Sequence, residues 1–144
     1  MSFVRDVLAA KDADVCTIGP DKTVLDAAVL MNHRRIGAVV VIDGDKIVGI
    51  FTERDIMNRV VAEKKDAAAT LVRDVMTTKV AFCEQNTTLE TCRGVMTKHK
   101  IRHLPVVEDG KLRGMVSSGD ILARRLQEHE ETIKYLHEYM HGPS

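Results

Sequence analysis

Two short polar motifs carry the side chains best suited to bind a small polar ligand. Thr52 and Asp55 form the first motif, and Ser117 and Asp120 form the second. In each, the sequence pattern changes from strand to helix, and the unpaired N–H groups of a helix N-terminus favour a phosphate. A carboxylate can also accept hydrogen bonds from both hydroxyls of a ribose. The same spacing caps a helix, so capping and ligand binding both remain open for either copy alone.

Other reactive side chains form no pattern typical of a catalytic site. Residues 137–141 read HExxH, an arrangement used by zinc hydrolases. Only three residues follow this segment and no catalytic domain surrounds it, so we expect neither a metal site nor hydrolysis there. Cys16, Cys83 and Cys92 form no CxxC pair and are expected to be small, mostly buried thiols in a reducing compartment. The sequence shows no nucleophile paired with a general base, so we expect that the protein is not an enzyme.

The two polar motifs belong to an internal duplication. A shift of 65 residues places 15–56 on 80–121 without a gap, and most aligned positions hold identical or similar residues. Short lead-ins repeat as well, VRDVL at 4–8 and VRDVM at 72–76, with a three-residue difference in spacing. A match that stays in register over strands, turns and helices indicates two copies of one structural unit.

Each copy has the pattern of a strand, a helix, a hairpin and a second helix. β-branched runs predict the first strands, and the pair Thr23 and Asp26 predicts the start of a helix. Short continuous apolar runs predict buried strands, and the sequences Asp-Gly-Asp and Glu-Asp-Gly predict tight turns. The expected first strands are 15–18 and 80–83, the next strands include 37–42 and 103–107, the turns are 43–45 and 108–110, and 63–70 connects the copies.

These elements predict a mixed α/β (α+β) fold made of two β-α-β-β-α units. A single unit buries too little apolar surface to be stable alone, so we expect two units to pack sheet to sheet as one pseudo-twofold module with two equivalent crevices. We expect a first repeat with its lead-in and connection over 1–70, a second repeat over 71–125, and a C-terminal helical extension over 126–144.

The duplicated chain resembles the CBS-domain family, named after cystathionine β-synthase, over residues 4–125. The resemblance rests on GIFTERD at 49–55, GMVSSGD at 114–120 and IRHLPVVEDGKLRG at 101–114. In that family, two repeats form one pseudo-symmetric module, and two modules commonly pair into a disc-shaped dimer. Many members bind AMP, ADP, ATP, NAD(H) or S-adenosylmethionine in the crevices and report metabolite status to a partner. The resemblance therefore implies a regulatory ligand and no catalytic cofactor.

The resemblance also implies which residues bind this ligand. Asp55 and Asp120 correspond to acids that bind the ribose, and Thr52 and Ser117 correspond to their hydroxyl companions. An adenine base is expected between the sheets, against apolar side chains and backbone. The candidates for that contact, each of which also fits a place in the hydrophobic core, are Ile18, Val39, Val40 and Ile50.

The two implied sites differ in charge. Arg54 lies in the first motif, where the second has Gly119, and only the second copy carries the basic pair Arg102 and His103. In related modules, that pair faces the phosphates of the nucleotide whose ribose rests on the first repeat. Arginine binds phosphate oxygens through several directed hydrogen bonds. The crevice of Asp120 lacks these cations and is expected to bind a less charged ligand or to stay empty. The expected phosphate-competent site contains Thr52, Arg54, Asp55, Arg102 and His103.

Composition narrows the partners. The formal net charge is zero, aromatic residues make up 3% and tryptophan is absent, which disfavours nucleic acid. The sequence contains no apolar run of membrane length and no signal-peptide pattern, so we expect no membrane partner and a cytoplasmic location. A seam at steps of four and three residues near the C-terminus favours packing between two subunits of a homodimer, with packing on its own module as the alternative. The seam consists of Leu122, Leu126, His129, Ile133, Leu136 and Met140.

The sequence therefore favours a regulatory module that binds an adenosyl nucleotide, such as AMP, ADP, ATP or an NAD(H)-type ligand, and signals to an unidentified protein. Two alternatives remain open. One is a nucleotide-independent dimerisation scaffold whose motifs only cap helices. The other is a sensor of S-adenosylmethionine.

Overall fold

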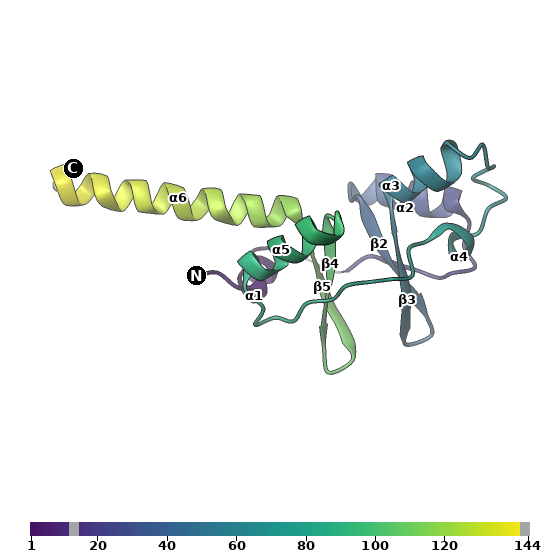
Figure 1. Cartoon of the computed structure of the whole chain (residues 1–144), viewed down its shortest axis with the longest axis horizontal. Coiled ribbons are helices and arrows are strands. Elements are labelled where there is room, and N and C mark those ends of the chain that lie inside the picture. The colour runs from purple at the N-terminus through teal and green to yellow at the C-terminus, as the bar shows by residue number, and fades with distance from the viewer. Residues whose placement is uncertain (12–14, 142–144) are drawn as a thin grey trace.

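The computed structural model describes residues 1–11 and 15–141. Its elements are short strands and helices, and the described part of the chain ends in one long helix (Figure 1). The elements are α1 (Val4–Ala10), β1 (Thr17–Ile18), α2 (Val24–Arg34), β2 (Ala38–Asp43), β3 (Lys46–Thr52), α3 (Glu53–Asp55), η1 (Ile56–Val61), α4 (Val72–Val75), α5 (Leu89–His99), β4 (His103–Glu108), β5 (Lys111–Ser117) and α6 (Ser118–His141).

Two small sheets form, one from each repeat. In the first, β1 runs parallel to β2, and β2 pairs antiparallel with β3. The second is the hairpin β4–β5. The registers match, because Ala38 faces Thr52 in one hairpin and His103 faces Ser117 at the equivalent place in the other. The prediction of a strand over 80–83 is wrong, because only a single parallel bridge, from Cys83 to Val106, forms there.

The helices that follow the first strands begin and end as local sequence dictates. At the start of α2, the Thr23 hydroxyl accepts a hydrogen bond from the backbone of Asp26, and the Asp26 carboxylate accepts one from the backbone of Thr23. This reciprocal capping box confirms the predicted helix start. Arg35 and Lys100, which end α2 and α5, both adopt left-handed backbone conformations. The second hairpin turns at Asp109 and Gly110, both with positive φ, as a two-residue turn of this kind requires.

Two clusters of buried apolar residues make up the core, one in each half. The lead-ins are exchanged between them. Val4 and Val7 of α1 pack in the cluster of the second repeat, whereas Val72 and Val75 of α4 pack in the cluster of the first. The predicted first unit, 1–70, therefore contributes residues to both clusters, because its α1 packs in the cluster of the second repeat.

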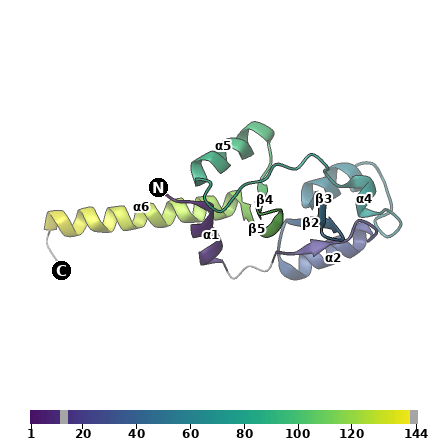
Figure 2. The ribbon, with the colours of Figure 1, turned by 90° about the horizontal axis from the view of Figure 1, so that it is seen from below.

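The two hairpins lie side by side in both views (Figures 1 and 2). Because side chains alternate across a strand, Val39 and Val41 face the first core cluster, whereas Val40 points to the other face of β2. Val40 is fully buried but belongs to neither cluster, and Pro105, at the equivalent place in β4, is fully buried too. Both residues are therefore buried on the strand faces turned away from the two clusters. The predicted mixed α+β fold of two packed repeats is confirmed.

The last helix, α6, continues without a break from the second repeat into the predicted extension and projects from the body (Figure 1). Residues 142–144 of that extension lie outside the described residues. All six positions of the predicted seam are exposed in the single chain, with Leu126 at 56% and Leu136 at 50%. In the part of the chain described, no helix has the length and apolarity that a membrane span requires.

Candidate functional site

A crevice of about 610 Å³ opens between the two repeats. The end of β3 and the start of α3 form one wall, the chain after α4 forms a second, and the turn from α5 into β4 forms a third. Segments far apart in sequence thus meet around one cavity. Of the residues predicted from sequence, it brings together Ile50, Thr52, Arg54, Asp55, Arg102 and His103.

Asp55 is the buried acid of this crevice, with 7% of its surface exposed. Its Oδ2 accepts the Thr52 backbone N–H at 3.0 Å, and its own N–H donates to the Thr52 hydroxyl at 3.1 Å. The capping function is therefore present. Its other oxygen, Oδ1, accepts the Thr77 hydroxyl at 3.1 Å, and the Arg59 guanidinium lies 3.8 Å away. One carboxylate oxygen thus holds the helix start while the other faces polar groups of the crevice.

The second motif repeats the cap but has a different neighbour. Asp120 Oδ2 accepts the Ser117 backbone N–H at 2.8 Å, and the Asp120 N–H donates to the Ser117 hydroxyl at 3.1 Å. The Lys11 ammonium lies 2.7 Å from the same Oδ2. Asp120 and Ser117 are partly exposed, and they lie apart from the first crevice, whose lining includes neither. Sequence reasoning found both carboxylates but not the lysine.

The apolar candidates for contact with a base do not all reach the crevice. Ile50 lines it. Val39 is fully buried in the first core cluster, Val40 is fully buried outside that cluster, and Ile18 packs partly buried against it. The crevice instead offers Met57, Val80, Ala81 and Ile101 as further apolar lining.

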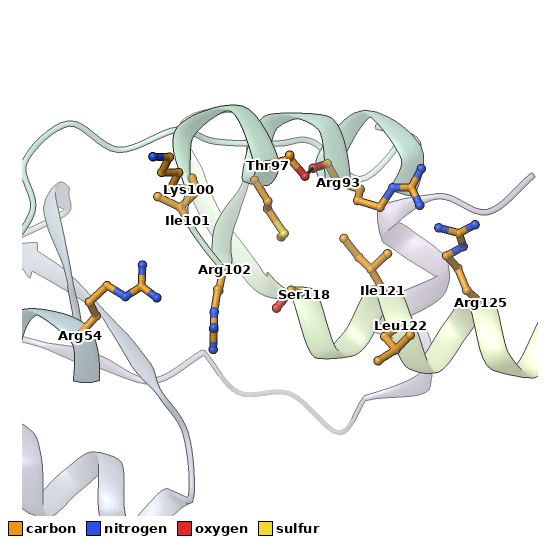
Figure 3. Close-up of a pocket in the computed structure, with 11 residues that line it drawn as sticks. Arg54, Arg93, Thr97, Lys100, Ile101, Arg102, Ser118, Ile121, Leu122 and Arg125 are labelled. Carbon is orange, nitrogen blue, oxygen red and sulfur yellow. Dashed lines mark hydrogen bonds between the residues drawn. The ribbon is translucent and has the colours of Figure 1, made fainter.

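Positive charge gathers at one end of the crevice and continues beyond it. Arg54 of the first repeat faces Lys100 and Arg102 of the second across the opening (Figure 3). These three residues also line an adjoining groove of about 660 Å³. Arg93 and Arg125 line its far end, and Met96, Ile121 and Leu122 supply apolar surface. The side chains that line this groove include five cations and no acid, which suits an anionic group that extends out of the crevice.

His103 is mainly buried at the junction of the repeats, and desolvation lowers the pKa of its imidazole. Glu53 and Asp120 act in the opposite direction, while Lys11 and Arg102 add to the lowering. The imidazole is therefore held toward its neutral form, in which one ring nitrogen donates and the other accepts. A phosphate placed beside it would favour the protonated form.

Sequence reasoning missed several residues of the crevice. Thr77 and Lys79 follow the second lead-in, and Thr77 also forms a backbone bridge with Ile50, with both N–O distances at 2.9 Å. Arg59 lies one turn after Asp55. The available signal was the position of Thr77 directly after VRDVM, but nothing in the sequence places this lead-in against the opposite repeat.

Comparison with known proteins agrees with this architecture. The CBS domain model matches twice, at residues 4–62 and 72–126. The CBS domain-containing protein YhcV of Bacillus subtilis is 34% identical over 126 residues, which cover 88% of this chain and 87% of YhcV. A CBS-domain containing protein of Agrobacterium tumefaciens has a solved structure with a TM-score of 0.82 and 39% identity, covering 86% of this chain and 99% of that one.

A further solved structure holds ligands. The CBS domain pair of protein MJ0100, in complex with 5′-methylthioadenosine and S-adenosyl-L-methionine, has a TM-score of 0.76 and 25% identity, and the match covers 90% of this chain and 98% of that one. The duplicated family match, the paired hairpins and the capped strand ends agree with one another. The chain belongs to the CBS-domain family, as a tandem pair of such domains.

Proposed function

We propose that this protein is a regulatory module that binds an adenosine-containing nucleotide in the crevice of Asp55 and has no catalytic activity of its own. Metabolite status is sensed as occupancy of this crevice and passed to a partner protein in the cytoplasm. The regulated partner is a protein that recognises the occupied form. A ligand can shift the module only by its differential affinity for two arrangements of the repeats, and a crevice lined from both repeats provides that difference.

The observation that carries this proposal is the placement of a buried carboxylate opposite a cluster of cations. Asp55 can accept the two ribose hydroxyls, while Arg54, Arg102 and Lys100 stand where phosphates would leave the crevice. His103 adds a donor on the same side. A cavity of about 610 Å³ is within the size range of small-molecule sites, which is roughly 300–1,000 Å³. The adjoining basic groove favours AMP, ADP, ATP or NAD(H) over an uncharged adenosine.

S-adenosylmethionine is the second candidate ligand. MJ0100 binds this compound and 5′-methylthioadenosine in a related domain pair. Both share the adenosine part with the nucleotides, and the ribose anchor at Asp55 serves them equally. The cations around Arg102 separate the candidates, because S-adenosylmethionine carries no phosphate for them to bind.

A ligand panel tests the proposal. Thermal unfolding is measured with AMP, ADP, ATP, NADH and S-adenosylmethionine for the wild type and for Asp55→Asn and Asp120→Asn. Selective binding to the native state raises the Tm by mass action. We expect at least one nucleotide to raise the Tm of the wild type and of Asp120→Asn. Most of this increase should be lost in Asp55→Asn.

The choice of asparagine keeps the control clean. Its carbonyl can still accept the Thr52 N–H, so the local cap is retained while the charge is removed. Absence of any shift with all five compounds would contradict the proposal and favour the dimerisation scaffold. The feature that supports the scaffold is the exposed apolar seam of α6, in which Leu126 is 56% and Leu136 50% exposed.

A further inference from the structure

Lys11 makes a double contact at the Asp120 motif, where the sequence predicts the second crevice. It caps the C-terminal end of α1, and its ammonium lies 2.7 Å from Asp120 Oδ2 and donates to the backbone carbonyl of Met115 at 2.7 Å. Both side chains of the ion pair are mostly covered, with 29% of Lys11 and 22% of Asp120 exposed. A cation held by a carboxylate and a strand carbonyl together is fixed more firmly than a single surface ion pair.

In the first crevice the cation lies farther from the acid: the Arg59 guanidinium is 3.8 Å from Asp55 Oδ1 and donates to the carbonyls of Val75 and Met76. The lead-in alignment that places VRDVL on VRDVM makes Lys79 the equivalent of Lys11 and Thr77 the equivalent of Ala9. Thr77 gives Asp55 a hydroxyl donor, and its backbone N–H donates to the carbonyl of Ile50. Ala9 has no side-chain donor, so in the second crevice Lys11 serves both acceptors. Lys79 remains exposed on the wall of the open crevice.

We propose that Lys11 determines the ligand stoichiometry of the module, by occupying the Asp120 carboxylate as an internal substitute for a bound ribose. This inference rests on the proposed function and extends it to the second crevice. The sequence difference between Thr77 and Ala9 makes one crevice receptive and keeps the other closed to adenosyl compounds. The module then binds one ligand per chain.

Displacement of Lys11 weakens ligand binding at Asp120. A ribose that takes this carboxylate must first break a charge-assisted hydrogen bond and leave the Met115 carbonyl without its donor. Loss of one hydrogen bond to a charged group corresponds to a factor of about 10–150 in affinity. Removal of the ammonium should therefore strengthen binding in the second crevice by at least about tenfold.

Titration calorimetry with AMP and with S-adenosylmethionine tests this inference. The variant Lys11→Met keeps the length and apolar stem of the side chain and removes the charge. We expect one ligand per chain for the wild type and two per chain for Lys11→Met. The second ligand should disappear again in Lys11→Met combined with Asp120→Asn. Lys79→Met, the same change at the equivalent lysine, should not add a site.

The outcomes separate this inference from the proposed function. One ligand per chain in both wild type and Lys11→Met overturns the role of Lys11 and leaves the first crevice intact as the binding site. Two equal sites in the wild type overturn the role of Lys11 as well. Binding only in Lys11→Met, lost on adding Asp120→Asn, supports the role of Lys11 and overturns the assignment to Asp55. Binding in neither protein overturns both.

Discussion

Asp55 caps the start of α3 and also lines the crevice, so its replacement should lower the free energy of unfolding even without ligand. Asp55→Ala loses the hydrogen bond from the Thr52 N–H at 3.0 Å and the one from the Thr77 hydroxyl at 3.1 Å. Hydrogen bonds to a charged group contribute about 1.5–3 kcal/mol each, and water that enters the emptied site offsets part of the loss. We therefore expect a decrease in the free energy of unfolding of about 2–4 kcal/mol.

Urea unfolding followed by far-UV circular dichroism measures this loss. For a chain of this size, it corresponds to a decrease in Tm of roughly 5–15 °C, so the variant remains folded at room temperature. Asp26→Ala is the matched control, because Asp26 forms the same reciprocal cap with Thr23 on an exposed surface. It has no counterpart of Thr77.

The difference in stability between Asp55→Ala and Asp26→Ala measures what the buried contact with Thr77 contributes. If Asp55→Ala and Asp26→Ala lose equal stability, the buried contact with Thr77 contributes nothing and Asp55 acts as a cap alone. Thr77→Val gives an independent measure, since it removes the hydroxyl and leaves the cap of Asp55 complete. We expect its loss to account for most of the difference between the two alanine variants.

Three further results are expected. Arg102→Gln should weaken AMP binding by about tenfold or more while adenosine binding stays unchanged, because one charge-assisted contact to phosphate is lost; calorimetry that shows equal loss for both ligands would place Arg102 away from the phosphate. Leu136→Glu should convert a dimer to a monomer in light scattering while the far-UV circular dichroism of the folded chain is kept, since the side chain is 50% exposed in the single chain; a wild type that is already monomeric contradicts intersubunit packing of α6. Burial lowers the pKa of His103 from its ordinary value of 6.5, so the unfolded chain binds this proton more readily and stability present above pH 6.5 is lost as the pH falls through the folded-state pKa. Replacement by His103→Gln should flatten that loss in Tm measurements between about pH 7.5 and pH 5.5, and an unchanged slope would contradict it.

The duplication made much of the fold predictable. Paired positions such as Thr52 with Ser117 and Asp55 with Asp120 predicted equivalent caps, and the structure has both. Local patterns specify these features, because capping and hairpin turns depend on residues within three or four positions of one another. The strand predicted over 80–83 failed for the opposite reason, since a strand needs a partner along its length and only Cys83 finds one.

Contacts between the repeats were the part that sequence could not supply. The two lead-ins have nearly the same sequence, so their local pattern does not reveal that α1 packs on the second cluster and α4 on the first. That exchange brings Thr77 to Asp55 and Lys11 to Asp120. The residues that most distinguish the two crevices were therefore invisible until the exchanged lead-ins were placed in space.

This exchange has a consequence for signalling. A ligand bound at Asp55 as proposed would contact the first repeat through β3 and α3, and the second through Arg102 and His103. Thr77 joins the same site from the connection between the repeats. Occupancy therefore fixes three segments relative to one another, and the free energy gained by holding them is the most that can be transmitted to a partner. The second crevice contributes no such ligand-dependent restraint while Lys11 holds Asp120, because that restraint is present whether or not a nucleotide is bound.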